Sequence, residues 1–217
     1  MSPGPFRACR PLVLASASPR RQALLAGQGL CFEVVPSTVR EPEPESDETP
    51  DAYAARMAGI KGHDIAGRHP DAVVISADTI VVRDGHILGK PATQAEALNM
   101  LRSLTGRWHE VTTGFCLIQA RQGLTQCRTV TTRVHMAQNS PEMLSAYVAT
   151  SEPMDKAGAY GIQGIGAFLV DEVQGSYTNV VGLPLRSVLD ILLKIQAIEV
   201  ADASGFAPAR CAVGGHG

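Results

Sequence analysis

Apolar and polar positions change their spacing several times along the chain, and the changes predict where strands and helices lie. Short apolar or β-branched runs predict strands over residues 12–15, 31–35, 72–76, 80–82, 87–88, 108–119, 129–136 and 167–173. Helical spacing behind Ser or Thr caps, or behind Pro at the first helical position, predicts helices over residues 19–26, 50–67, 93–106, 140–148 and 184–198. Helices thus alternate with strands, which predicts an α/β fold.

The length and composition limit the architecture. A chain of 217 residues that is 45% hydrophobic can bury a full core, and it suits one α/β domain or two small lobes that share a sheet. Residues 1–10, with Pro3 and Pro5, predict a flexible lead-in, and residues 11–198 predict a single two-lobed domain. The segment 199–217 is rich in Ala and Gly and predicts a disordered tail.

The charge and the cysteine content restrict which binding partners and which cellular compartment we expect. A formal net charge of −2 argues against a nucleic-acid partner, which normally requires a basic excess. No apolar run approaches the ~18 residues of a membrane span, so we expect no membrane association. The five cysteines are odd in number and lack CxxC spacing. They predict neither a disulfide framework nor a thiolate metal site, and they favour a reducing cytoplasm.

The strand-to-helix turn at residues 15–21 is the first candidate site. Such a turn aims backbone N–H groups and the positive end of the helix dipole at one spot. Here the turn also carries the hydroxyls of Ser16 and Ser18 and the guanidiniums of Arg20 and Arg21. This combination favours a polyphosphate site, but the pattern lacks Walker glycines. An ordinary turn with solvated arginines stays an alternative.

Two further segments place charged side chains next to predicted strands. Asp78 follows the buried strand 72–76, and we expect it where that strand leaves the sheet, which is where α/β folds gather ligands. A capping Asp is the alternative. Gly89-Lys90-Pro91 combines a close-approach glycine with a phosphate-binding cation, although a surface lysine explains it equally. Lys61 lies on the predicted helix 50–67.

Three other features complete the candidate chemistry. Residues 155–166 contain four glycines and no regular period, so they predict a shaped loop that lines a ligand site, with Gln163 placed to read a base. The Pro- and Glu-rich segment 36–47 is either a solvated linker or the source of one carboxylate for a divalent cation. His109 and His135 lack metal-ligand spacing, and we expect both to be structural.

Five motifs taken together resemble the Maf family of nucleoside triphosphate pyrophosphatases. They are Ser16–Arg21, Ser76–Thr79, Gly89–Pro91, Thr105–His109 and Asp155–Gly164, in matching order over roughly residues 12 to 197. The resemblance implies a two-lobed α/β fold around a long twisted mixed sheet, similar to that of inosine triphosphatases, with a cleft between the lobes. It also implies hydrolysis of a nucleoside triphosphate to the monophosphate and pyrophosphate, with a divalent cation (Mg²⁺, Mn²⁺ or Co²⁺), and a homodimer.

The resemblance also assigns roles to residues. Asp78 matches the family's proton acceptor, and Ser16, Arg21, Lys61 and Lys90 match its polyphosphate contacts. Glu41 matches the acidic residue near the metal, with Glu43 and Glu45 as close alternatives in the same segment. Arg20, Thr79 and Gln163 match the trio typical of the branch that acts on dTTP and UTP rather than on 7-methyl-GTP. Gly62 departs from the usual Ala, which should loosen its helix slightly.

The implied reaction leaves two questions open. Asp78 either takes the proton of the attacking water as a general base or binds the cation and orients the water. The substrates are dTTP and UTP, or modified pyrimidine nucleotides. A nucleotide-binding regulator of cell division with little turnover is the alternative function, and a phosphomonoesterase is a third. Release of pyrophosphate, of orthophosphate or of neither separates these three functions.

Overall fold

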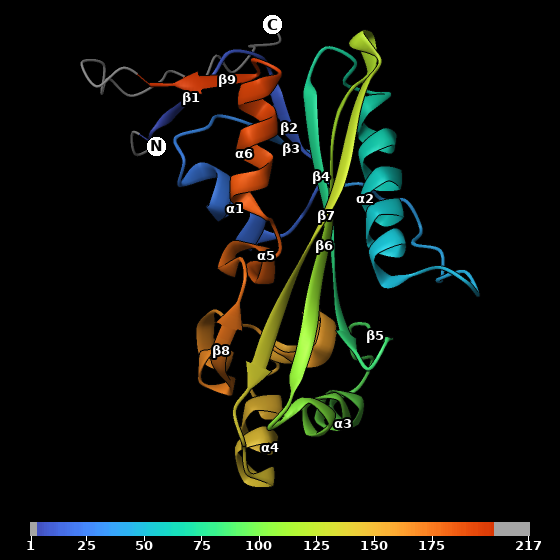
Figure 1. The fold of residues 1–217 in the computed structure, drawn as a ribbon, viewed down its shortest axis with the longest axis vertical. Helices are drawn as coiled ribbons and strands as arrows, with labels where there is room; N and C mark the ends of the chain where they lie inside the picture. The colour runs from blue at the N-terminus through green and yellow to red at the C-terminus, as the bar shows by residue number, and fades with distance from the viewer. Residues whose placement is uncertain (1–3, 202–217) are drawn as a thin grey trace, which may run out of the picture.

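A long twisted mixed sheet forms the body of the molecule (Figure 1). Residues 4–201 are described by the computed structural model. The sheet strands are β2 (Leu12–Leu14), β3 (Glu33–Val34), β4 (Val73–Arg83), β5 (His86–Leu88), β6 (Trp108–Gln119), β7 (Leu124–Met136) and β8 (Val170–Gln174). Their order is β3-β2-β4-β6-β7-β8, with β5 paired to β4. β2 is parallel to β3 and β4, and the later pairs are antiparallel, which confirms the predicted α/β class with a mixed sheet.

The strands β4, β6 and β7 are long enough to connect the two ends of the molecule (Figure 1). β6 is buried from Val111 to Gln119, as expected for a central strand that is covered on both faces. β7 begins at Leu124, five residues before the predicted strand 129–136. The prediction missed these residues because the first half of β7 is exposed and polar. β8 pairs only with the last residues of β7, so the first half of β7 lacks an apolar pattern.

The predicted helices form behind the predicted caps. The helices are α1 (Pro19–Ala26), α2 (Pro50–Ala66), α3 (Gln94–Leu104), α4 (Pro141–Ala149), α5 (Tyr177–Val181) and α6 (Leu185–Lys194). The side chains of Ser18, Thr49, Thr93 and Ser140 each accept a hydrogen bond from a backbone N–H of the first turn. The sequence did not predict the five-residue α5. Within residues 4–201, no helix combines the length and apolarity needed to cross a bilayer.

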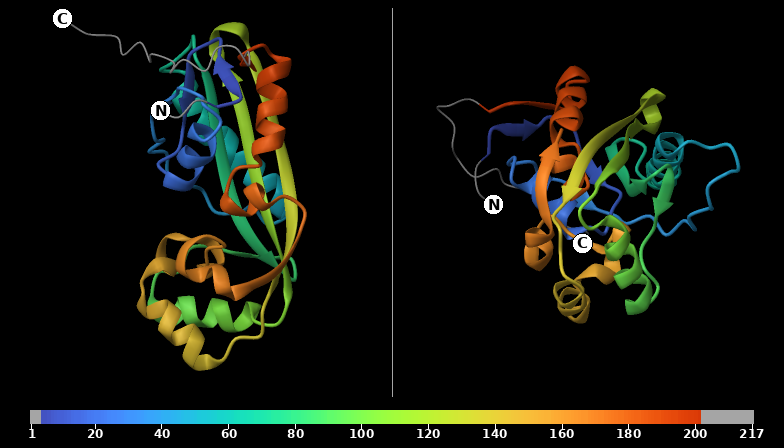
Figure 2. Two further views of the ribbon diagram at one scale, coloured as in Figure 1. Left: turned by 90° about the vertical axis from the view of Figure 1, so that its left-hand side faces the viewer. Right: turned by 60° about the horizontal axis from the view of Figure 1, so that its bottom comes forward.

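Two lobes share this sheet. In the first lobe α1 and α6 cover one face of the sheet and α2 covers the opposite face (Figure 1). In the second lobe α3 and α4 pack at the far end of the long strands (Figure 2). Each lobe has its own buried cluster, one around Leu14, Leu25 and Leu192 and another around Leu101 and Leu144. The long strands are the shared elements between the two cores.

The two ends of the described chain pair with each other. β1 (Phe6–Ala8) and β9 (Ile198–Val200) form a two-stranded antiparallel sheet, so the predicted flexible lead-in contains a strand. The predicted helix 184–198 ends at Lys194, because the backbone turns at Gln196 with a φ of 55°. Ile198 then enters β9 instead of continuing the helix. The predicted disordered tail lies outside the described residues, apart from its first positions.

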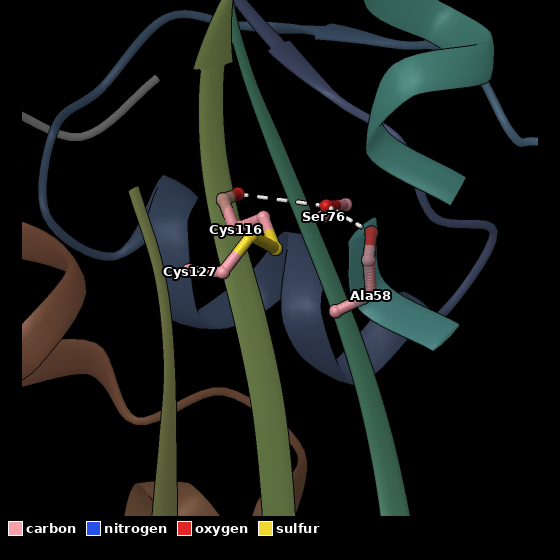
Figure 3. Close-up of a disulfide and its surroundings, with 4 residues drawn as sticks. All are labelled: Ala58, Ser76, Cys116 and Cys127. Atoms are coloured by element: carbon pink, nitrogen blue, oxygen red, sulfur yellow. Dashed lines mark hydrogen bonds between the residues drawn. A yellow bond between two sulfur atoms is a disulfide. The ribbon is translucent and has the colours of Figure 1, made fainter. Parts of the chain in front are cut away.

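The expectation that the cysteines form no disulfide is wrong for one pair. Cys116 on β6 and Cys127 on β7 lie directly opposite each other in the antiparallel register and are bonded (Figure 3). The sequence separation of 11 residues carries no known motif, and only the β6–β7 register makes the two residues neighbours. Within residues 4–201, Cys9 forms no disulfide.

Both histidines have the structural surroundings expected of them. His109 is 3% exposed, and its Nε2 atom lies 2.6 Å from the hydroxyl of Tyr160. His135 packs against the ring of Trp108, and its Nδ1 atom lies 2.7 Å from Oδ1 of Asp171. Within residues 4–201, no group of three or more His, Cys, Asp or Glu side chains is arranged to hold a metal ion.

Candidate active site

A cleft of about 620 Å³ is lined by all nine residues to which the family resemblance assigns a role. Its lining comes mainly from the turn after β2, from the segment 36–41, from α1, α2 and β4, from the segment after β5, from residues 155–163 and from the end of α5. The nine predicted residues that line it are Ser16, Arg20, Arg21, Glu41, Lys61, Asp78, Thr79, Lys90 and Gln163. These residues lie far apart along the chain, so the fold alone brings them together.

The turn between β2 and α1 forms one edge of the cleft. Ser18 caps α1 and accepts a hydrogen bond from the backbone N–H of Arg21, and Pro19 opens the helix. Ser16 is 8% exposed, and its hydroxyl accepts from the backbone N–H of Ser18 at 3.3 Å. The N-terminus of α1 therefore points toward the cleft and provides the partial positive charge that suits an anion.

Arg21 is held by protein acceptors. Its Nε donates to the carbonyl of Gly182 at 2.7 Å, and its Nη1 donates to the Ala77 carbonyl and the Ser16 hydroxyl at 2.8 and 3.0 Å. Its Nη2 donates to the hydroxyl of Thr79 at 3.1 Å. Burial lowers the pKa of the guanidinium, and the nearby Asp78 partly offsets this effect. Arg21 thus ties α1 to β4 and to the end of α5, and one of its five N–H groups remains for a ligand.

Asp78 lies in the middle of a strand, not at its end. The prediction that β4 stops before Asp78 is wrong, because β4 runs without interruption from Val73 to Arg83. The register pairs Asp78 with Gly114 of β6. The Asp78 side chain nevertheless lines the cleft, because β2 pairs with β4 only up to Ile75 and β5 pairs with it only from Val81, so the stretch between them lies at an open edge of the sheet.

Lys61 of α2 joins two carboxylates from different segments. Its Nζ lies 2.6 Å from Oδ1 of Asp78 and 2.6 Å from Oε1 of Glu41. The side chains of Lys61 and Asp78 are 17% and 13% exposed, so solvent screens this pair less than a surface ion pair. Oδ2 of Asp78 has no protein partner in the described part of the chain.

Glu41 extends from the Pro- and Glu-rich segment toward this centre. Partial burial raises the pKa of its carboxyl, but the hydrogen bond and the charge of Lys61, together with Lys90 and Arg21, outweigh burial and lower the pKa overall. The carboxylate is therefore charged at neutral pH. Glu43 contributes a backbone carbonyl to Arg56 instead. Mg²⁺ in proteins is held by one or two carboxylates together with substrate phosphates and water, so Glu41 and Asp78 fit a cation that enters with a nucleotide.

Two glycines set the close approach of α2 to the sheet. A Cβ atom at Gly114 would lie 2.2 Å from the backbone carbonyl oxygen of Ala54 on α2. A Cβ at Gly62 would lie 2.5 Å from Oγ of Ser76, whose hydroxyl donates to the Ala58 carbonyl at 2.7 Å (Figure 3). Gly62, expected to loosen the helix, therefore makes room for Ser76. This close packing brings Lys61 within reach of Asp78.

The opposite side of the cleft is made of irregular segments. Lys90 and Gln163 are exposed, and neither side chain has a hydrogen-bond or ion-pair partner within residues 4–201. Gly158 donates its N–H to the carbonyl of Gly89 at 3.1 Å, which joins loop 155–166 to the segment that carries Lys90. Arg20 lies 3.5 Å from a carboxylate oxygen of Asp155 in the same loop.

The family model for Maf-like proteins matches residues 11–195. The chain belongs to the Maf-like family. Two relatives, both named dTTP/UTP pyrophosphatase, support this membership. The protein of Nitratidesulfovibrio vulgaris is 49% identical over 91% of this chain and 94% of its own. The protein of Oleidesulfovibrio alaskensis is 48% identical over 94% of this chain and 96% of its own.

The fold also extends beyond the Maf-like family. The solved structure of a HAM1 protein from Coxiella burnetii superposes with a TM-score of 0.51 at 16% identity. The match covers 85% of this chain and 99% of that protein. At this identity the comparison concerns the fold, and it agrees with the mixed α/β sheet described above.

Sequence reasoning left out several residues that line the cleft of this Maf-like chain. Lys156 belongs to a quoted motif but received no role, and its Nζ donates to the carbonyl of Glu152 and to Asp155, both at 2.6 Å. Tyr160 is buried, and its hydroxyl is hydrogen-bonded to Nε2 of His109. Glu152 does not line the cleft and carries no motif signal, although its carboxylate accepts backbone hydrogen bonds from the loop that carries Gln163. Their roles depend on contacts across the fold, which a linear pattern does not show.

Proposed function

We propose that this Maf-like chain hydrolyses dTTP and UTP, or modified pyrimidine nucleotides, to the monophosphate and pyrophosphate. The observation that carries the proposal is the ion-paired centre in which Lys61 joins Asp78 and Glu41 inside a cleft that also contains Lys90 and Gln163. The names of the relatives support the same reaction for this chain.

The proposed step is attack of a water oxygen on the α-phosphorus. The bond between the α-phosphorus and the oxygen that bridges to the β-phosphorus breaks, and pyrophosphate leaves with that oxygen. Oδ2 of Asp78 accepts the proton of the water, a contribution typically worth ~10²–10⁴ in rate. Lys61 holds the Asp78 carboxylate in place through their ion pair, while Lys90 and the N-terminus of α1 stabilise the negative charge of the leaving group.

Glu41 and Asp78 would hold the divalent cation, whether Mg²⁺, Mn²⁺ or Co²⁺. When bound, the cation neutralises phosphate charge and orients the α-phosphate. If Oδ2 of Asp78 binds the cation, the carboxylate orients the water instead of accepting its proton. In either case Lys61 prevents the two carboxylates from repelling each other before substrate arrives.

Gln163 and Arg20 would select the base. Uracil and thymine present an acceptor at O4 and a donor at N3, which match the donor and acceptor of the Gln163 amide. An amide can rotate to match cytosine equally well. Arg20 only donates, so it is the better discriminator and favours O4 over the amino group of cytosine. A mismatch that leaves such donors unpaired costs ~1–3 kcal/mol, or about one to two powers of ten in selectivity.

A nucleotide panel scored for pyrophosphate tests the proposal. Wild-type protein with added Mg²⁺, Mn²⁺ or Co²⁺ should release pyrophosphate from dTTP and UTP, and Asp78→Asn should lower kcat by ~10²–10⁴ while nucleotide binding persists. Asp190→Asn is a matched control, because Asp190 lies on α6 and, in the part of the chain that the structure describes, pairs only with Arg186. Release of orthophosphate would contradict the proposal, and binding without turnover would favour the regulator of cell division.

The expected homodimer and cytoplasmic location stay predictions from the sequence and the family resemblance. Sedimentation of the full chain at micromolar concentration measures its mass directly, and a monomer that turns over dTTP would show that the cleft works without a second copy.

A further inference from the structure

The short segment that carries Gln163 is pinned at both ends by two side chains from outside the loop. Tyr147 is 2% exposed on α4, and its hydroxyl accepts a hydrogen bond from the backbone N–H of Gly161 at 3.2 Å. The same hydroxyl donates to Oε1 of Glu152 at 3.0 Å. Glu152 in turn accepts from the backbone N–H groups of Ile165 and Gly166, both at 2.9 Å.

These bonds leave only three residues, 162–164, between the anchored N–H groups. We refer to the side chains of Tyr147 and Glu152 as the clamp. Gln163 lies at the centre of the three residues, with its side chain exposed in the cleft and without a protein partner in the described chain. The clamp therefore determines the position of the Gln163 backbone without touching the Gln163 amide.

The loop backbone fits closely around the clamp. Gly164 has a φ of 76°, and a Cβ there would lie 2.8 Å from Oε2 of Glu152. A Cβ at Gly166 would lie 2.5 Å from the Tyr147 hydroxyl. Two of the four glycines in the loop are thus explained by contact with the clamp. Burial raises the pKa of Glu152, but the two backbone donors and the Tyr147 hydroxyl outweigh this effect and lower it overall, so the carboxylate remains an acceptor at neutral pH.

We propose that Tyr147 and Glu152 are positioning residues for base selection, because they hold the backbone on both sides of Gln163. The inference rests on the proposed function, in which Gln163 reads the pyrimidine. Selective hydrogen bonding requires the amide to stay within a few tenths of an ångström of its partner atoms, and a fixed backbone also reduces the entropy lost on binding. Neither residue lines the cleft, so neither contacts the nucleotide.

A double-mutant cycle in an Asp78→Asn background tests the inference by binding alone. The ratio of the tripolyphosphate and UTP dissociation constants measures what the nucleoside adds to binding, and it should fall about 10-fold in Gln163→Ala and about 5-fold in Tyr147→Phe, through weaker binding of UTP. The double variant should match Gln163→Ala, because the clamp acts through Gln163. Glu152→Gln should reproduce the effect of Tyr147→Phe. Tyr177→Phe is the matched control, since Tyr177 is 48% exposed on α5.

Several outcomes would overturn the inference. Tyr147→Phe could weaken binding of UTP and of tripolyphosphate equally, or its effect could add in full to that of Gln163→Ala, and either result would indicate general support of the fold. Equal affinity of the starting protein for UTP and tripolyphosphate would also overturn it. Amide exchange of residues 161–166 should accelerate in Tyr147→Phe and not in Tyr177→Phe, and unchanged exchange would exclude the clamp. Because no turnover is measured, absence of pyrophosphate release by the wild type would count against the proposed function alone.

Discussion

The two walls of the cleft differ in how their polar groups are satisfied. The wall built from α1, α2 and β4, here called the strand wall, carries Arg21, Lys61 and Asp78, and protein partners pair all three. The wall built from irregular segments, here called the loop wall, carries Lys90 and Gln163, whose side chains lack partners within residues 4–201. The two walls therefore have different roles in binding. Charges on the strand wall are arranged before substrate binds, and groups on the loop wall are left for the substrate to satisfy.

This contrast has a structural cause. Side chains on regular elements are fixed by packing, as Gly114 and Gly62 fix α2 against the sheet. The loop wall is fixed instead through its backbone. Its N–H groups donate hydrogen bonds to the Tyr147 hydroxyl, the Glu152 carboxylate and the carbonyl of Gly89. The side chains of Lys90 and Gln163, which lack partners within the described residues, can meet a phosphate or a base.

The largest effect should come from the centre of the strand wall. Lys61→Met keeps the length of the side chain but leaves Asp78 and Glu41 facing each other without a cation. We expect kcat for pyrophosphate release to fall by about 10²–10³. The pKa of Glu41 loses its main lowering influence, so the acid limb of activity should move to higher pH. Lys194→Met, at an exposed position of α6, is the control, and an equal effect of the two variants would argue against the ion-paired centre.

The next effect concerns the support of the loop wall by His109. Burial lowers the pKa of His109 to about 4, whereas the unfolded chain binds a proton with the ordinary pKa of 6.5. The unfolded state is therefore favoured as pH falls, and the free energy of unfolding should drop by about 3 kcal/mol between pH 6.5 and pH 4. Urea unfolding over this range measures the drop. His109→Gln should remove most of it, and exposed His63→Gln should leave it in place.

The disulfide behind the strand wall should have a somewhat smaller effect. Reduction of Cys116–Cys127 should lower the free energy of unfolding by about 2–3 kcal/mol, because the bridge restricts the unfolded chain. Urea unfolding with and without a dithiol reductant measures this change, and Cys127→Ser should not respond to reductant. Identical unfolding of the wild type under both conditions would mean that the cysteines are reduced, as their number and spacing predicted.

The smallest effect should come from the loop wall itself. Lys90→Ala should raise KM for dTTP about 10-fold, since Lys90 offers its charge to the phosphates, while the free energy of unfolding should change by less than about 0.5 kcal/mol. Steady-state kinetics and urea unfolding measure the two quantities. If the free energy of unfolding fell by more than about 1 kcal/mol while KM stayed unchanged, Lys90 would stabilise the fold instead of binding substrate. The two walls would then not differ in the way described above.

Local signals in the sequence determined the helix starts, the buried strands and the candidate chemistry. Ser18-Pro19 and Ser140-Pro141 start helices because a cap and its N–H partners lie within three residues of one another. Strands such as β2 were predictable because a strand covered on both faces is apolar at every position. The motif residues identified the chain's family and the contents of one cleft before any distance was known.

Contacts between distant segments required the tertiary structure. The sequence indicates a strand end at Asp78, but the residue lies in the middle of β4. It indicates a free cation at Arg21, but the guanidinium is hydrogen-bonded to protein acceptors. It indicates an unpaired thiol at Cys116, but the residue is bonded to Cys127. The physical reason is the same in each case. Strand register and helix-to-sheet distance depend on the packing of the whole chain, so they determine which side chains meet without changing any local pattern.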